Sequence, residues 1–203
     1  YTLSLHDALP ISLADGTRSL GDNSTNPVVV TLSTSNFAVT HNSNGRLRLT
    51  VGSYTFASTA NELNSVNPAH ISATRIPDDD SGNKRVCICF SDTGDGNKGK
   101  SVIATVDSAN AVTFGDVVTF NEASTTDIHC TYSLDGWVYV LFIDSATQMI
   151  AFNPELLTEK TDKKQVAGSA PNRVEICAVG HSVVGIYNGY AKTIYRTEDV
   201  LNF

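Results

Sequence analysis

Four polar residues stand at equivalent places in the sequence, each directly before a short apolar run: Asn36, His70, Asp127 and Arg173. Their side chains offer an amide, an imidazole, a carboxylate and a guanidinium, so together they donate and accept hydrogen bonds and carry both signs of charge. If the apolar runs are strands around one axis, these residues form a polar ring at a mouth where ligands bind. The alternative is that they are solvated strand entries, where polar residues are common.

Two further residues, His129 and Glu175, follow two positions after Asp127 and Arg173. On adjacent copies of one structural unit they could pair, which would favour the charged imidazole. As an acid–base couple they lack a nucleophile or a third carboxylate. We therefore interpret all six residues as candidate ligand contacts and assign no catalytic residue. Asp127 and Glu175 remain the carboxylate candidates for a glycoside hydrolase, a class that needs two carboxylates at a set separation.

The loop Ser91–Gly99 invites a calcium interpretation through Asp92, Asp95 and Asn97. The EF-hand pattern needs a Glu at its twelfth position, and counting from Asp92 that position is Ile103. A Gly-rich hairpin loop is the better interpretation. The sequence indicates no metal site and no cofactor.

The four cysteines all lie in β-rich apolar runs. They lack the Cys-x-x-Cys spacing of zinc sites, and a chain of this size with so few cysteines is not a disulfide scaffold. We expect buried thiols that pack as small hydrophobic side chains. The four are Cys87, Cys89, Cys130 and Cys177.

A repeated hairpin is the element that must position these residues. The segment from Phe37, "FAVTHNSNGRLRLTVGS", aligns without a gap with "IHCTYSLDGWVYVLFID" from Ile128, and similar units begin at Ile71 and Val174. Asn-Gly and Asp-Gly supply the positive-φ positions of tight hairpin turns. Third strands follow in register, and a fourth is plainest at Val117–Phe120.

This recurrence predicts an all-β, β-propeller-like fold with about four blades of four antiparallel strands, beginning near residues 37, 71, 128 and 174. An immunoglobulin-like sandwich is the rival fold, but it does not explain a hairpin that recurs four times. Asn153–Lys164 could form a turn or two of helix. Val28–Leu32 is β-rich and has no blade of its own. It would either close a ring as the outermost strand of the last blade or lie beside the blade that starts at Phe37, in a fragment of a larger ring.

Ser101–Asp144 carries a family resemblance in its "VTFG…VVTFN" pair, its Ser/Thr-rich linker and its "DI…TY" to "VYV.F.D" hairpin. The stretch resembles repeats of β-propeller proteins found in phage tails and environmental sequences. The resemblance is weaker in the flanking copies. It implies attachment at a virion or extracellular surface and transfers no catalytic residue.

The start of the chain has a different origin. Tyr1–Ile11 match the translation of a common short-read sequencing adapter at every position, so we interpret them as a library scar. We expect Tyr1 to about Leu20 not to pack regularly. This divides the chain into a scar (1–11), an irregular segment (12–27) and propeller repeats (28–203).

The composition of the chain limits the classes of partner that it can bind. The net charge of −7 repels phosphate backbones, which argues against nucleic acid. The longest apolar run, Trp137–Ile143, is far shorter than the roughly 20 residues of a membrane-spanning helix. We predict a non-enzymatic binding or structural module that recognises a surface glycan or protein. The alternative is a propeller glycoside hydrolase or lyase that acts on surface polysaccharide.

Overall fold

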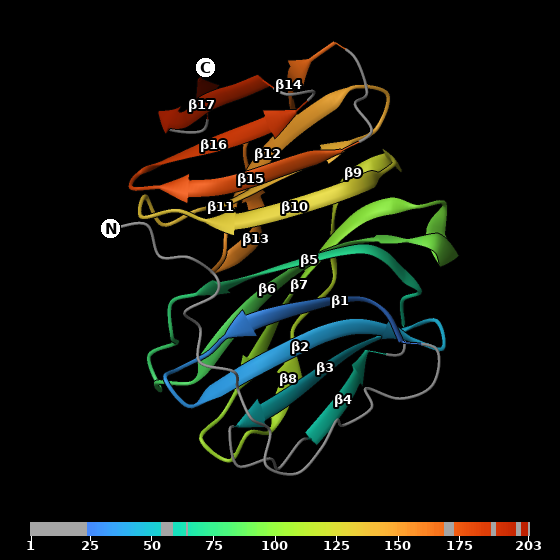
Figure 1. Cartoon of the computed structure of the whole chain (residues 1–203), viewed down its shortest axis with the longest axis vertical. Helices are drawn as coiled ribbons and strands as arrows, with labels where there is room; N and C mark the ends of the chain where they lie inside the picture. Colours follow the sequence, from blue (N-terminus) through green and yellow to red (C-terminus); the bar gives the residue numbers. More distant parts are fainter. Residues whose placement is uncertain are drawn as a thin grey trace, which may run out of the picture.

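The computed structural model describes residues 24–53, 59–63, 65–168, 173–187, 190–197 and 200–202. These residues form four antiparallel sheets of four or five strands, in agreement with the predicted propeller-like fold of about four blades. In Figure 1 the sheets follow one another along the long axis, from the blue first sheet at the lower end to the red fourth sheet at the upper end. The expected lack of packing at Tyr1–Leu20 concerns residues outside the described ranges.

Each sheet runs in chain order from an inner strand through a middle strand to the outer strands. The first sheet contains β1 (Ser24–Thr31), β2 (Asn36–Ser43), β3 (Arg46–Ser53) and β4 (Thr59–Leu63). The second contains β5 (Pro68–Ile76), β6 (Lys84–Asp92), β7 (Lys98–Val106), β8 (Val112–Phe114) and β9 (Val118–Ser124). The third contains β10 (Thr126–Tyr132), β11 (Val138–Ile143), β12 (Thr147–Asn153), β13 (Leu156–Lys160) and β14 (Lys164–Ala167). The fourth contains β15 (Val174–Val179), β16 (Ser182–Tyr187), β17 (Tyr190–Thr197) and β18 (Val200–Asn202).

The inner strands β1, β5, β10 and β15 lie side by side, and a hydrophobic core fills the space between each pair of neighbouring sheets. The middle strands face two cores at once, because successive side chains of a strand point to opposite faces. On β6, Val86, Ile88 and Phe90 pack toward the first sheet, whereas Cys87 and Cys89 pack toward the third. A short 3-10 turn, η2 (Thr93–Asp95), joins β6 to β7.

The first sheet begins one strand earlier than the sequence pattern predicts. The hairpin that starts at Phe37 forms β2 and β3, which are the second and third strands of the sheet, and the inner strand is β1. Residues 24–27, which were predicted to be irregular, belong to β1. The error has a simple cause: strands one and two make the same strand–turn–strand pattern as strands two and three. Both Asn44 and Gly45 have positive φ (53° and 76°), as the predicted tight turn requires.

Val28–Leu32 does not close a ring. Val30 pairs with Ala38 of β2, and the first and fourth sheets lie at opposite ends of the row of sheets (Figure 1). The predicted helix at 153–164 is also wrong, since Leu156–Lys160 forms β13 and pairs with β12. Pairing satisfies backbone groups at the outer edge of β12 that a helix would leave open.

The structure confirms the predicted third strands of the last three sheets and an outer strand near residues 117–120. β7, β12 and β17 are third strands, as expected, and Val118–Ser124 pairs with β7 as an outer strand. The outer position of the second sheet is divided between β8 and β9, and that of the third sheet between β13 and β14.

Candidate functional site

Three neighbouring inner strands break their regular ladder at the same place. β1, β5 and β10 each shift register near their first residues, and each carries a non-glycine residue with positive φ at the break. These residues are Asn26 (φ 51°), His70 (47°) and Asp127 (45°). The left-handed conformation costs an L-residue roughly 1–2 kcal/mol, although Asn and Asp tolerate it better than most. Backbone strain of this kind tends to cluster at functional sites.

The three bulges open onto one cavity of about 250 Å³. Because a bulge redirects the side chain at the break, the polar groups of three strands reach the same space. The cavity is lined by Asn26, Pro27, Val28, His70, Ile71, Asp127, Ile128 and His129.

Asp127 also ties its bulge to the next sheet. Its carboxylate accepts a hydrogen bond from the backbone N–H of Val174, the first residue of β15. This contact explains the residue type at position 127, since an acceptor is needed for the first amide of the neighbouring inner strand.

A chain of polar side-chain contacts extends the cavity toward the fourth sheet. His129 Nδ1 lies 3.1 Å from Glu175 Oε2, and His129 Nε2 lies 3.8 Å from Asp127 Oδ1. Glu175 Oε1 lies 3.4 Å from Arg173 Nε. The predicted pairing of His129 with Glu175 is therefore present, and the imidazole lies between the two carboxylates.

Five of the six predicted residues thus come together, and Asn36 does not. Asn36 lies at the opposite end of the β1–β2 hairpin, where its side-chain amide donates to Asn110 Oδ1 at 3.3 Å and its carbonyl accepts from Leu32 N. Asn26, not Asn36, is the residue of the first sheet that lines the cavity. The prediction was wrong because the first blade was placed one strand late. The signal was present: like His70 and Asp127, Asn26 precedes the apolar run of its inner strand.

We name these residues the inner-strand polar cluster: Asn26, His70, Asp127, His129, Arg173 and Glu175. With neutral imidazoles the cluster carries two carboxylates and one guanidinium, and it combines donors and acceptors for hydrogen bonds. No Ser, Cys or Lys nucleophile is found among the residues that line the cavity. Across the described ranges, no three His, Cys, Asp or Glu side chains are arranged to hold a metal ion.

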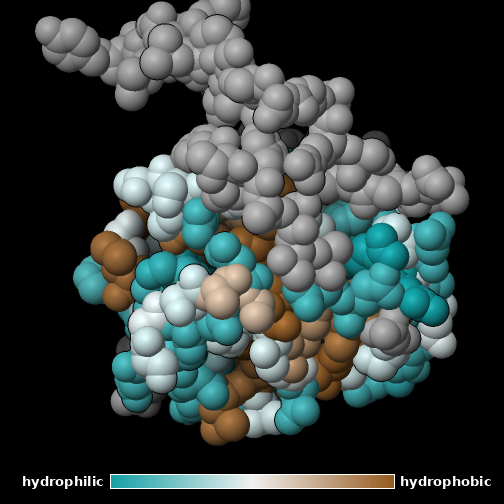
Figure 2. All heavy atoms as spheres, turned by 90° about the horizontal axis from the view of Figure 1, so that it is seen from below, coloured by the Kyte–Doolittle hydropathy of each residue, from teal (hydrophilic) through white to brown (hydrophobic). Residues whose placement is uncertain are grey.

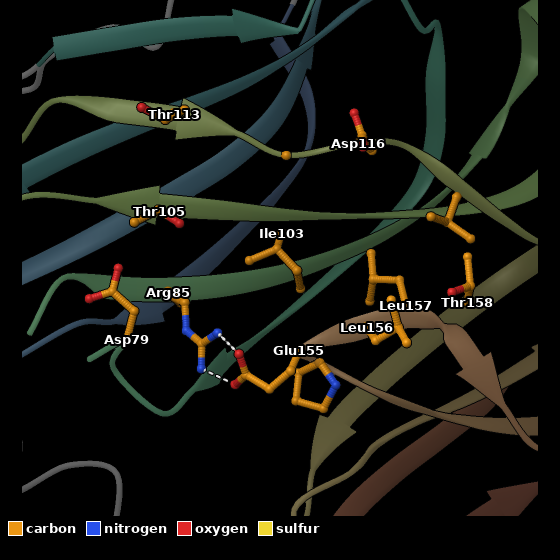
Figure 3. A pocket seen from close by; sticks show the side chains of 13 residues that line it. Asp79, Arg85, Ile103, Thr105, Thr113, Asp116, Glu155, Leu156, Leu157 and Thr158 are labelled. Atoms are coloured by element: carbon orange, nitrogen blue, oxygen red, sulfur yellow. Dashed lines mark hydrogen bonds and ion pairs between the residues drawn. The ribbon is translucent and has the colours of Figure 1, made fainter. Parts of the chain in front are cut away.

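A second hollow of about 460 Å³ lies between the second and third sheets (Figure 3). At its rim Arg85 forms a two-pronged ion pair with Glu155 of the third sheet, with Nη1 2.7 Å from Oε2. The Arg85 hydrogen bond lowers the pKa of Glu155. Ile103, Leu156 and Leu157 supply an apolar floor.

This groove is not predictable from the sequence pattern, because its walls come from segments that lie far apart in the chain. Its principal charged groups are already partnered within the protein. Arg85 Nε donates to Pro77 O at 2.8 Å, and Asp79 accepts hydrogen bonds from Asn83 and Ser81. Arg85 thus acts as a clamp between sheets, so the inner-strand polar cluster is the better candidate site.

The prediction of buried cysteines is confirmed for three of the four residues and wrong for the fourth. Cys87, Cys89 and Cys130 are buried between the second and third sheets, as expected. Cys177 is exposed, contrary to the prediction, because it lies on the face of β15 that points away from the third sheet.

Comparison with known proteins places the chain in no family: no protein-family model matches it, and no curated protein is recognisably similar. In the part of the chain that the structure describes, no helix has the length and apolar character to cross a membrane.

Proposed function

We propose that the chain is a non-enzymatic, propeller-like binding module of a virion tail or other surface-attachment protein, and that the inner-strand polar cluster binds a surface glycan. One observation carries the proposal. Three adjacent inner strands place strained, polar, non-glycine residues at the same bulge, and all three line a single cavity. A fold that needed only a break in the ladder could use glycine there without strain.

The chemistry of the cluster supports a hydroxyl-rich ligand. Sugar hydroxyls both donate and accept hydrogen bonds, and the cluster presents carboxylates, imidazoles, an amide and a guanidinium within reach of one another. His129, Glu175 and Arg173 retain 27%, 49% and 76% side-chain exposure, so they remain accessible to a ligand. A protein partner is the second candidate, since the same mixture of charges suits a polar epitope.

Glycoside hydrolysis is the weaker alternative. Asp127 and Glu175 are the two carboxylates of the cluster, and both contact the same imidazole. A hydrolase needs the scissile bond between its two carboxylates. In this arrangement the His129 ring fills that space, which supports binding over bond cleavage.

The proposal is tested by screening the whole chain on an array of bacterial and animal surface glycans, followed by calorimetry on the best ligand. We expect Asp127→Asn and Glu175→Gln to weaken binding at least tenfold. Asp80→Asn and Glu122→Gln are matched controls, because both residues are exposed and lie outside the cluster. Equal affinity of all four variants would contradict the assignment of the site. If no glycan binds, the protein partner becomes the leading candidate.

A panel of aryl-glycosides separates binding from hydrolysis. We expect no turnover by the wild-type protein. Turnover that is lost in Glu175→Gln and kept in Glu122→Gln would overturn the non-enzymatic assignment.

A further inference from the structure

The fourth sheet presents an exposed apolar face that points away from the third sheet. Val174, Val183 and Ile194 point toward the third sheet and are fully buried. The residues that alternate with them therefore point outward. Among these, Ile186 and Tyr195 are 43% and 46% exposed. The described residues of the outer face of the fourth sheet are Glu175, Cys177, Val179, Ser182, Val184, Ile186, Ala191, Thr193, Tyr195, Val200 and Asn202.

Equivalent positions in the second and third sheets are buried. Ser72, His129 and Glu175 each stand two residues after the polar residue of their inner strand, and each pairs with a middle-strand residue. Those partners are Cys89, Leu141 and Ile186, respectively. Cys89 and Leu141 are 0% exposed because the next sheet covers them, whereas Ile186 lacks that cover. The outer face of the fourth sheet is thus of the kind that another sheet covers elsewhere in the molecule.

The charges on the first and fourth sheets indicate what kind of surface can pack against the outer face of the fourth sheet. Glu175 is the one charged side chain among the eleven described residues of the outer face, and it is already held by His129 and Arg173 at the inner edge. The outward residues of the first sheet include Arg46, Arg48 and Glu62, which form ion pairs with one another. Figure 2, seen from the first-sheet end, shows hydrophilic residues interspersed with apolar ones.

We propose that a second copy of this chain covers the outer face, with the two fourth sheets packed face to face about a two-fold axis. The charged first sheet is a poor counterpart for an apolar face, whereas an identical face carries a single carboxylate that is paired within its own copy, so charge repulsion is small even though the chain carries −7 overall. Self-complementary pairing of the same patch is the commonest form of homodimer.

The area of the outer face determines how strong the proposed dimer can be. Strands of six to eight residues, with about 3.3 Å per residue and about 4.8 Å between strands, span roughly 20 Å by 20 Å. Two copies would bury on the order of 800 Å², less than the roughly 1,200–2,000 Å² of stable complexes. The dimer is therefore weak and depends on concentration.

Sedimentation velocity of the whole chain tests the proposal, from a few micromolar to several hundred micromolar, with a reductant that keeps Cys177 from forming a disulfide. We expect the wild-type protein to shift from monomer to dimer. Ile186→Asp should weaken the association at least tenfold, and Val29→Asp should leave it unchanged. Val29 is a matched control, because it is an exposed β-strand residue (67%) on the first sheet. A wild-type monomer at every concentration, or equal loss of the dimer in both variants, would overturn the proposal.

A second readout remains informative if Ile186→Asp folds poorly. Cys177 lies on the proposed interface, and the other three thiols are buried. Its alkylation by a maleimide should slow several-fold as the wild-type concentration rises, and should stay constant in Tyr195→Glu. An alkylation rate of the wild-type protein that does not depend on concentration would contradict the proposed dimer.

Discussion

Two neighbouring strands of the second sheet have the same length and opposite surroundings. The middle strand β6 is buried at every residue from Arg85 to Asp92. The inner strand β5 is fully buried at only three of its nine positions, Pro68, Ile71 and Ile76. The middle strand faces a core on each side, whereas the inner strand has a bulge and a polar edge. The buried middle strand therefore carries more of the stability of the sheet, while the residue proposed to bind a ligand, His70, lies on the inner strand.

The third sheet repeats the division. All six residues of β11 are buried, whereas only Ile128 and Cys130 are buried among the seven residues of β10, which also carries Asp127 and His129. Substitutions on middle strands should therefore change the free energy of unfolding, and substitutions on inner strands should change ligand binding.

The largest effect is expected for Phe90→Ala on β6. Phe90 is 0% exposed and belongs to the core between the first and second sheets. Removing a buried aromatic ring costs about 3–5 kcal/mol, through lost transfer free energy and the cavity that remains. Urea unfolding followed by circular dichroism measures this loss. A loss below about 1 kcal/mol would show that β6 does not carry the stability assigned to it.

A smaller, pH-dependent effect is expected for Asp92→Asn at the end of β6. Asp92 is 3% exposed, and burial acts to raise its pKa. Hydrogen bonds from Lys100 Nζ (2.7 Å) and from the amides of Asn67 and Gly94 (3.0 Å each) outweigh burial and lower the pKa. The carboxylate therefore stabilises the fold above its unfolded-state pKa of about 3.9 and loses this contribution as the pH falls through the lower folded-state value.

We expect Asp92→Asn to lower the free energy of unfolding by about 1–3 kcal/mol at neutral pH, since a charged hydrogen bond in a buried site is lost. The difference from the wild-type protein should shrink as the pH falls below about 4, because the unfolded chain then binds a proton at this carboxyl while the folded carboxylate, with its lower pKa, does not. Urea unfolding at several pH values checks this. A difference that grows toward acid pH would have the wrong sign for the mechanism.

The sequence predicted the middle strands better than the inner ones. Runs such as "VCICF" and "WVYVLFI" are apolar on both faces, so their strand character and burial are clear from composition. Val117–Phe120 was also recognised, from its β-branched residues. The shift of the first blade arises because β1 and β2 satisfy the same local pattern, and they differ in that β1 contacts β5 more extensively than β2 does.

The candidate site was predictable where it repeats. His70 and Asp127 occupy the same place in successive units, and the pairing of His129 with Glu175 followed from their equivalent positions. The groove beside Arg85 was not predictable, because Glu155 lies 70 residues away and reaches Arg85 only after the sheets pack. The exposure of Cys177 depends on which face of the last sheet is covered, and β-propensity carries no such information.

His70 tests whether the inner-strand bulge is kept for function at a cost in stability. His70 is exposed and adopts φ 47°. We expect His70→Gly to raise the free energy of unfolding by up to about 1 kcal/mol, because glycine adopts this conformation without strain. His70→Val should lower it by about 1–2 kcal/mol, since a β-branched residue is poorly tolerated there. Thermal unfolding of both variants measures the difference, and a destabilised His70→Gly would mean that the side chain itself supports the fold.

The smallest effect on stability is expected for Glu175→Gln, although this residue is central to the proposed site. Glu175 contacts His129 and Arg173, but all three side chains retain solvent exposure, and ion pairs of this kind contribute only about 0–1 kcal/mol. Glutamine also keeps an oxygen that can accept a hydrogen bond from His129. We expect the free energy of unfolding to change by less than about 0.5 kcal/mol, while glycan affinity falls at least tenfold. Urea unfolding measures the free energy of unfolding, and calorimetry on the same preparation measures the glycan affinity. A loss of about 2 kcal/mol or more would mean that the cluster holds the third and fourth sheets together, and the division between middle and inner strands would then not extend to β15.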